Sequence, residues 1–192
     1  MKTSLFRCVL IVAAVVMSAL PASAQSSFGL GVSFLGDERG TGFLLDYSGP
    51  LASQRGDNVV GWVGEFALHH KGFGGAAAGI EGGATTIMAQ LGLRVTGKAN
   101  EKVSWHGQGL VGLMRTGFGV EAAGLNREIC DLYDIDCSAG NSDTGGVLTI
   151  GGGLQYALTD ATHLRGQLDF PIALGAEGGG TTRFSIVLVF TR

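Results

Sequence analysis

The segment that decides the fold lies close to the end of the chain and reads RFSIVLVF over residues 183–190. Its even-numbered positions, Phe184 to Phe190, are all large and apolar, whereas Arg183 and Ser185 occupy alternate positions. A period of two is typical of a β-strand with one apolar face, because successive side chains of a strand point to opposite sides of the sheet. The pattern therefore predicts a strand here.

The same alternation recurs seven more times toward the N-terminus, and no apolar stretch beyond residue 26 is long enough for a membrane helix, which needs roughly 20 residues. We therefore predict an all-β chain of eight antiparallel strands. Pro171 lies within the seventh run, where it removes a ladder donor, so we expect a bulge or the upper end of the strand there. The apolar faces of the eight predicted strands run over Phe28–Phe34, Phe43–Tyr47, Val60–Leu68, Ile87–Val95, Val103–Leu113, Leu148–Leu158, Leu164–Ile172 and Phe184–Phe190.

Eight such strands hide their edges by closing into an up-and-down barrel. A soluble lipocalin-like carrier would turn the apolar face inward, whereas an outer-membrane barrel turns it toward lipid. The second arrangement is favoured because the opposite face is rich in Gly, Ser, Thr and Gln but poor in Lys and Glu, which suits a crowded lumen. Aromatic residues near strand ends also fit interfacial girdles: Phe28, Phe34, Tyr47, Trp62, Trp105, Tyr156 and Phe190.

The expected connections alternate in length, as they do in membrane barrels, whose outer loops are the longer ones. With both termini periplasmic, the expected periplasmic connections span residues 48–57, 97–102 and 159–162. The expected outer connections span residues 37–40, 70–82, 116–143 and 175–181. The first hairpin is the exception to the length rule.

The N-terminus carries the features of a secretory signal peptide. Lys2 and Arg7 form a basic start, an apolar run extends from Cys8 to Leu20, and the small residues 22–24 form a cleavage context. We predict cleavage after Ala24, so that residues 1–24 are the signal peptide and residues 25–192 form one outer-membrane barrel.

Composition excludes several other classes. The chain has 192 residues, of which 34 are Gly, but no Gly-X-Y period accompanies them, so collagen is excluded. Hydrophobic residues make up 45% and charged residues 15%, which does not describe a disordered tail. Cleavage removes Lys2 and Arg7 from 13 basic residues, leaving 11 against 16 acidic ones and a formal charge of −5. Without a basic patch, nucleic-acid binding has no support.

The signal peptide, the eight alternating strands and the strand at residues 183–190 together resemble the small bacterial outer-membrane barrels. That class includes opacity-type proteins and the transmembrane domain of outer membrane protein A. The resemblance implies a Gram-negative outer-membrane location, contact with lipid and lipopolysaccharide, and recognition of the last strand by the barrel-assembly machinery. Members commonly end on an aromatic residue, whereas Thr191 and Arg192 follow Phe190 here. No chain remains after the barrel for a peptidoglycan-binding domain, so that tethering role is not carried over.

The alternation of side chains between the two faces of each strand places a set of ionisable residues inside the barrel. Charges in a narrow lumen must be paired or hydrated, because an isolated buried ion costs several kcal/mol. We expect a structural network that fills the lumen, and the alternative is a gated pore in which the same pairs rearrange. The predicted lumen residues are Asp46, Glu65, Arg94, His106, Arg165 and Asp169.

An enzyme needs a nucleophile and a base held together. The best candidates are His69 and His70 near an outer rim, with Glu65 lower on the same strand, but no serine pairs with them in the sequence. We therefore predict no enzymatic activity, no cofactor and no metal site. An outer-membrane enzyme acting on envelope lipid stays as an alternative.

The expected outer connection 116–143 carries six acidic residues and few basic ones. Cys130 and Cys137 form an even pair in an oxidising compartment, so we expect a disulfide between them, and two free thiols or a two-ligand metal site are the alternatives. The predicted function is structural or adhesion-like surface interaction through this connection. The residues predicted to contact a partner or cation are Glu128, Asp131, Tyr133, Asp134 and Asp136.

Overall fold

The computed structural model describes residues 26–36, 40–55, 58–75, 80–122, 138–175 and 179–191. No helix in these ranges is long and apolar enough to span a membrane. The strands, in chain order, are β1 (Ser27–Leu35), β2 (Gly40–Arg55), β3 (Asn58–Gly75), β4 (Ile80–Lys98), β5 (Val103–Ala122), β6 (Ser138–Ala157), β7 (Thr162–Leu174) and β8 (Arg183–Thr191).

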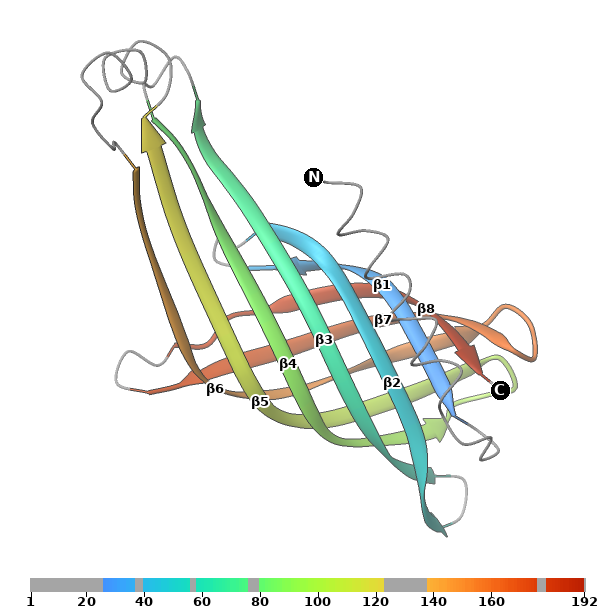
Figure 1. Ribbon diagram of the computed structural model, residues 1–192. Helices are drawn as coiled ribbons and strands as arrows, with labels where there is room; N and C mark the ends of the chain where they lie inside the picture. Colours follow the sequence, from blue (N-terminus) through green and yellow to red (C-terminus); the bar gives the residue numbers. More distant parts are fainter. Residues whose placement is uncertain are drawn as a thin grey trace.

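The strands form a closed barrel in which each pairs antiparallel with its neighbours in the chain. The ring closes where β8 pairs with β1, from Ser27 opposite Thr191 to Leu35 opposite Arg183. Figure 1 shows the strands strongly tilted around the barrel, with the end of β8 beside the start of β1. The eight-stranded antiparallel up-and-down barrel predicted from the alternation is confirmed.

The apolar face of the barrel points outward. Leu91, Leu113 and Leu154 are each at least 60% exposed, whereas Glu65 and His69, from the opposite face of β3, are buried. This surface suits lipid, because membrane barrels alternate apolar side chains outside with polar ones inside. The lipocalin-like alternative, which needs the apolar face inside, is therefore wrong.

Aromatic residues pack against one another on this outer surface. Tyr47 and Trp62 have ring centroids 5.2 Å apart, near the end of the barrel where β1 begins and β8 ends. Phe34 and Phe184 stack at 6.4 Å near the opposite end. Their positions agree with the aromatic girdles expected at the two membrane interfaces.

Pro171 lies beyond the ladder between β7 and β8, which ends at Asp169 opposite Arg183. On its other side it is paired with Thr149 of β6. Its carbonyl accepts a hydrogen bond of 2.9 Å from the Thr181 amide. Because the regular ladder with β8 has already ended, the missing N–H of Pro171 breaks no ladder hydrogen bond with β8. The expectation that Pro171 occupies the upper end of a strand agrees with this position.

Three expected connections are corrected, because strands continue into them. Most of residues 48–57 and 70–82 belongs to β2, β3 and β4, and both ends of 116–143 belong to β5 and β6. These stretches lack apolar alternation, yet the main chain pairs in a ladder whatever the side chains are. Hydropathy alternation therefore ends where the strands leave the lipid, while the strands themselves continue.

A four-stranded sheet consequently projects from one end of the barrel. β2 accompanies β3 only as far as Thr41 opposite His70, and β7 accompanies β6 only as far as Leu174 opposite Gly146. Beyond these points β3 to β6 continue together, as Figure 1 shows at the upper left. We call residues 70–75, 80–85, 117–122 and 138–142 the protruding sheet.

Candidate functional site

The lumen of the barrel contains a cluster of six buried charges. Each comes from an inward-facing position, and each side chain is at most 6% exposed. The cluster comprises Asp46 of β2, Glu65 of β3, Arg94 of β4, Arg165 and Asp169 of β7, and Arg183 of β8.

One half of the cluster is built around Asp46. Its Oδ2 accepts hydrogen bonds from Nη2 of Arg94, at 2.8 Å, and from Nη2 of Arg165. Arg94 also donates from Nε and Nη2 to Oε1 of Gln108, at 2.9 and 2.7 Å. The Gln108 amide then donates to Oδ1 of Asp169 at 3.0 Å, which links this half to the other.

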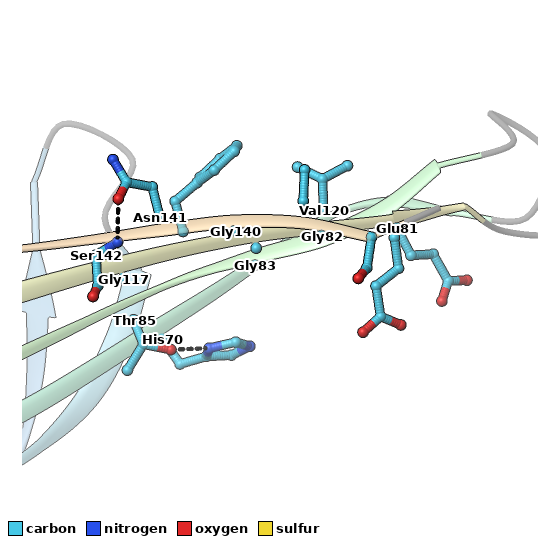
Figure 2. A pocket seen from close by; sticks show the side chains of 15 residues that line it. His70, Glu81, Gly82, Gly83, Thr85, Gly117, Val120, Gly140, Asn141 and Ser142 are labelled. Atoms are coloured by element: carbon cyan, nitrogen blue, oxygen red, sulfur yellow. Dashed lines mark hydrogen bonds between the residues drawn. The ribbon is translucent and has the colours of Figure 1, made fainter. Parts of the chain in front are cut away.

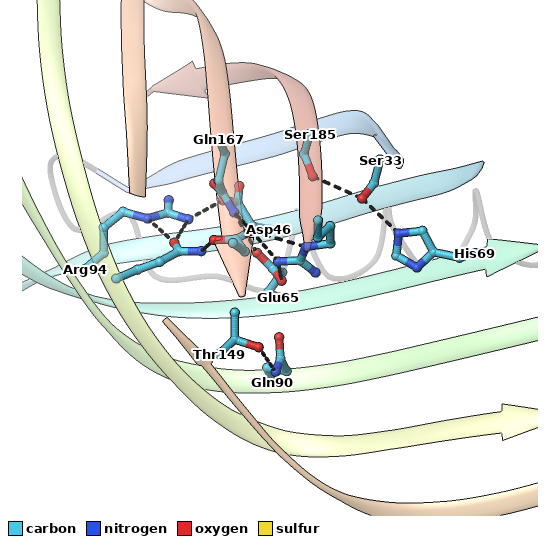
Figure 3. A network of polar contacts seen from close by, with 12 residues as sticks. Ser33, Asp46, Glu65, His69, Gln90, Arg94, Thr149, Gln167 and Ser185 are labelled. Atoms are coloured by element: carbon cyan, nitrogen blue, oxygen red, sulfur yellow. Dashed lines mark hydrogen bonds and ion pairs between the residues drawn. The ribbon is translucent and has the colours of Figure 1, made fainter. Parts of the chain in front are cut away.

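The second half is built around Arg183. Its Nη2 donates to Glu65 and, at 2.7 Å, to Oδ2 of Asp169. The Gln167 amide bridges the same two carboxylates, at 2.6 Å from Asp169 and 3.3 Å from Glu65. Figure 3 shows Glu65, Gln167 and Asp46 close together within this network. Three guanidinium groups therefore face three carboxylates, and the cluster carries no net charge.

Electroneutrality explains how so many charges can be buried together. Each ion loses hydration on burial, and only close opposite charges with further hydrogen bonds offset that cost. Here the two glutamine amides supply those further bonds. With Gln108 of β5, the cluster joins six strands across the lumen, so it holds opposite walls of the barrel at a defined distance.

Two glycines provide the space for the carboxylates. A Cβ placed on Gly29 would collide with the Asp46 carboxylate and lie 3.0 Å from Nη2 of Arg165. A Cβ on Gly151 would collide with the Asp169 carboxylate. Small residues on the inward face are therefore a requirement of the charge cluster.

The structure places five of the six predicted lumen residues in this cluster, namely all except His106. His106 is buried, but neither ring nitrogen has a hydrogen-bond partner in the described part of the chain. Sequence reasoning missed Arg183, although it shares the parity of Ser185. It also missed Gln108 and Gln167, because an uncharged amide carries no signal that separates a network member from ordinary lumen filling.

The two histidines of the enzyme alternative lie on opposite faces of β3. His69 is fully buried, and its Nε2 lies 2.9 Å from Oγ of Ser33, which also accepts a hydrogen bond from Ser185 at 3.0 Å. His70 is exposed, and its Nδ1 lies 3.0 Å from Oγ1 of Thr85. The two imidazoles therefore do not share one site, and only His70 is exposed.

The charge cluster predicts a closed lumen and electrical silence. The charge cluster links β2, β3, β4, β7 and β8 across the lumen, and an eight-stranded barrel has room for little beyond its own side chains. We expect no step conductance from the wild-type protein in planar bilayers. Regular conductance steps that change on Arg94→Ala would contradict the closed lumen and favour the gated-pore alternative.

Several predictions concern residues outside the described ranges. These are the signal peptide at residues 1–24, the Cys130–Cys137 disulfide, and the contact residues Glu128, Asp131, Tyr133, Asp134 and Asp136. They stay predictions. In the described ranges, no group of three His, Cys, Asp or Glu side chains is arranged to hold a metal ion.

The barrel is similar to solved structures of outer-membrane proteins. The barrel is similar to Ail, the attachment invasion locus protein of Yersinia pestis, with a TM-score of 0.58 and 18% identity over 88% of this chain and 99% of that one. The structure of Ail in complex with the heparin analogue sucrose octasulfate has a TM-score of 0.59 and 17% identity, over 88% of this chain and 100% of that one. A major outer membrane protein from Thermus thermophilus has a TM-score of 0.60 and 13% identity, over 87% of this chain and 99% of that one. No family model and no curated protein matches the sequence.

The chain has the fold of a small outer-membrane barrel. This fold confirms the resemblance found in the sequence. Together with the apolar exterior, it places the protein in the outer membrane.

Proposed function

We propose that the protein is a surface-interaction barrel, in which the closed barrel is an anchor and the protruding sheet presents contacts outside the membrane. The observation that carries this proposal is the continuation of β3 to β6 beyond the ends of β2 and β7. Strands that extend past the lipid add nothing to membrane anchoring, so their role lies in the medium above it.

The protruding sheet offers backbone as well as side-chain contacts. Within the described residues, β6 pairs with β5 up to Ser138 but with β7 only as far as Gly146, so its outer half forms an edge of the sheet. Sheet edges are templates for pairing with another polypeptide. The Ser142 amide donates a hydrogen bond of 2.9 Å to Oδ1 of Asn141. An added strand would therefore pair with the main chain of the neighbouring edge residues.

The comparison with Ail supports a surface role in general terms, since that protein is named for attachment and has been solved with a heparin analogue. Charge argues for a different partner here. Glu81 and Glu121 of the protruding sheet are paired opposite each other, and Lys71 lies on the other face. The connection that joins the last two strands of this sheet is acidic. We infer a basic or cation-bridged partner rather than a polyanion, with Asp131, Asp134 and Asp136 contributing and the Cys130–Cys137 disulfide shortening the connection.

A trimmed barrel tests the proposal. Residues 71–84 and 117–142 would each be replaced by Asn-Gly, a two-residue turn that suits a hairpin. The residues joined, His70 with Thr85 and Thr116 with Asp143, are already opposite one another in the sheet. We expect attachment of bacteria to host cells or matrix to fall to the level of cells without the protein.

Correct insertion of the trimmed barrel is the control for this experiment. The trimmed variant must reach the outer membrane in wild-type amount and still shift on a denaturing gel after boiling, because its charge cluster is untouched. Wild-type attachment by a correctly inserted trimmed barrel would overturn the proposal. A variant in which residues 126–138 alone are deleted separates the acidic connection from the strands.

A further inference from the structure

The large apolar side chains of the protruding sheet lie on the face opposite to the lipid-facing side of the barrel. In β5, Leu113 points outward to lipid, whereas Leu110 is buried in the lumen. Phe118 and Val120 occupy even-numbered positions, as Leu110 does, so they lie on the inward face. Figure 2 shows Val120 on the side of the sheet opposite to Glu81. Lipid surrounds the outward face, so it does not contact these apolar side chains.

Two phenylalanines form what we call the aromatic platform on this inward face. Phe73 of β3 and Phe118 of β5 stack with ring centroids 5.3 Å apart and planes inclined by 17°. Gly82 of β4 is paired with Phe73, and a Cβ there would lie 2.5 Å from Cε2 of that ring. The missing side chain at Gly82 therefore lets the ring lie against β4 and reach its partner. The platform is already assembled before any contact with another molecule.

The aromatic platform is exposed. Phe73 is 38% exposed and Phe118 is 49% exposed, and Ile80 on the same face is 48% exposed. Apolar groups gathered on one face of a protein mark interaction sites, and aromatic residues carry much of the binding energy at protein interfaces. Similar exposure on the barrel is explained by lipid, but here it indicates a partner in the medium.

The platform borders an edge of the sheet. β3 pairs with β2 only as far as His70, so Phe73 and Gly74 pair with β4 alone within the described residues. An extended polypeptide added to such an edge gains main-chain hydrogen bonds, which a lipid or a saccharide cannot provide in a ladder. On the β6 edge the inward-facing side chains are Ala139 and Asn141, which are small or polar. The edge beside the aromatic platform is therefore that of β3.

The two faces of the sheet select the side chains of an added strand. On the outward face, Glu81 and Glu121 are exposed and paired opposite each other. Glu81 is also opposite Gly74, so no side chain separates an added strand from its carboxylate. The two strand spacings between them total about 10 Å, which a basic and an acidic side chain span together. Because Lys71 and Asp143 on the inward face carry opposite charges, basic residues fit the outward face and apolar residues the inward one.

We propose that the protruding sheet binds an extended polypeptide segment, which adds to the edge of β3 as a fifth strand. Its apolar side chains pack on the aromatic platform, and its basic side chains approach Glu81 and Glu121. The inference rests on the proposed function, because it names the chemistry of the surface partner. That partner carries a segment in which apolar and basic residues alternate.

A synthetic peptide tests the site. The probe is fluorescein-labelled Arg-Val-Arg-Phe-Arg-Val-Arg, and the full barrel is kept in a non-ionic detergent so that the micelle does not attract the peptide. Fluorescence anisotropy measures the Kd. We expect this peptide to bind about tenfold or more tightly than a control peptide in which all the arginines precede the apolar residues. Equal binding of the two peptides would reflect charge attraction alone and would overturn the added strand.

Two phenylalanine variants of β3 locate the site. Phe73→Ala removes half of the aromatic platform and is expected to raise the Kd by about tenfold or more. Phe66→Ala is the matched control, because Phe66 is 37% exposed on the same strand and also belongs to an aromatic pair, but it faces lipid. This control should leave the Kd within about twofold. Equal affinities of the two variants, each shifting normally on a gel after boiling, would overturn the platform.

Further measurements examine the charges and the edge. Glu81→Gln combined with Glu121→Gln should weaken binding of the alternating peptide and reduce its dependence on salt. A benzophenone in place of the phenylalanine ring of the peptide should cross-link to residues 71–75. Cross-links confined to residues 138–146 would overturn the assignment to β3. Dimers of the barrel that exclude the peptide would assign the platform to a second copy and overturn the proposal.

Attachment of bacteria is assayed on the same variants, which separates this inference from the proposed function. We expect Phe73→Ala to reduce attachment and Phe66→Ala to leave it unchanged. A Phe73→Ala protein that loses the peptide but attaches normally would overturn the partner assigned here and leave the proposed function standing. Normal attachment by the trimmed barrel would overturn the proposed function itself.

Discussion

Replacing Arg183 with methionine is expected to lower the free energy of unfolding of the barrel by about 3–5 kcal/mol, the usual cost of removing one partner from a buried ion pair. Arg183 is fully buried and contacts both Glu65 and Asp169. Without it, the cluster holds two guanidinium groups against three carboxylates. Refolding into lipid vesicles at increasing guanidinium concentration, followed by the fluorescence of Trp62 and Trp105, would measure the loss.

Two further variants separate charge from volume. Arg115→Met removes an exposed guanidinium and is expected to change stability by about 0.5 kcal/mol or less, as surface substitutions do. Adding Asp169→Asn to Arg183→Met restores electroneutrality and should recover at least half of the loss. If the double variant is no more stable than Arg183→Met, the loss reflects packing and not uncompensated charge.

The membrane-spanning part of the fold could be predicted from the sequence because lipid imposes a period of two. In β8, for example, the positions from Phe184 to Phe190 face lipid and alternate with buried Ser185, Val187 and Val189. Alternation alone does not say whether the apolar face points inward or outward. Composition decided this, because the opposite face is rich in Gly, Ser, Thr and Gln and suits a lumen. Where strands rise above the lipid, both faces contact water, so the alternation vanishes and the ends of β3, β5 and β6 could not be placed.

The charge cluster was predictable in membership but not in pairing. Parity assigns Asp46, Arg94 and Arg165 to the lumen, whereas their meeting depends on strand register and on how far the barrel is sheared. Residues 46 and 165 are far apart in sequence and on strands that are not neighbours, so no local pattern links them. The Ser33–His69 contact escaped for the same reason, since it also joins two strands that are not adjacent.

Gly29→Val is expected to be the second most damaging single change, lowering the free energy of unfolding by about 1–3 kcal/mol or more, the range for overpacked interiors. A side chain there would meet the Asp46 carboxylate, the Val187 side chain at 2.9 Å and the Arg165 guanidinium at 3.0 Å. It would therefore separate an ion pair as well as crowd the lumen. The same vesicle unfolding assay applies.

Gly166→Val is the matched control, because a Cβ at Gly166 meets nothing within 4 Å. Valine favours strands and glycine weakens them, so this variant should be neutral or slightly stabilising. The contrast follows from the face each glycine occupies: Gly29 lies beside the charge cluster, and Gly166 lies on the lipid side. If the two variants unfolded at the same denaturant concentration, the glycines of the inward face would not be making room for the buried charges.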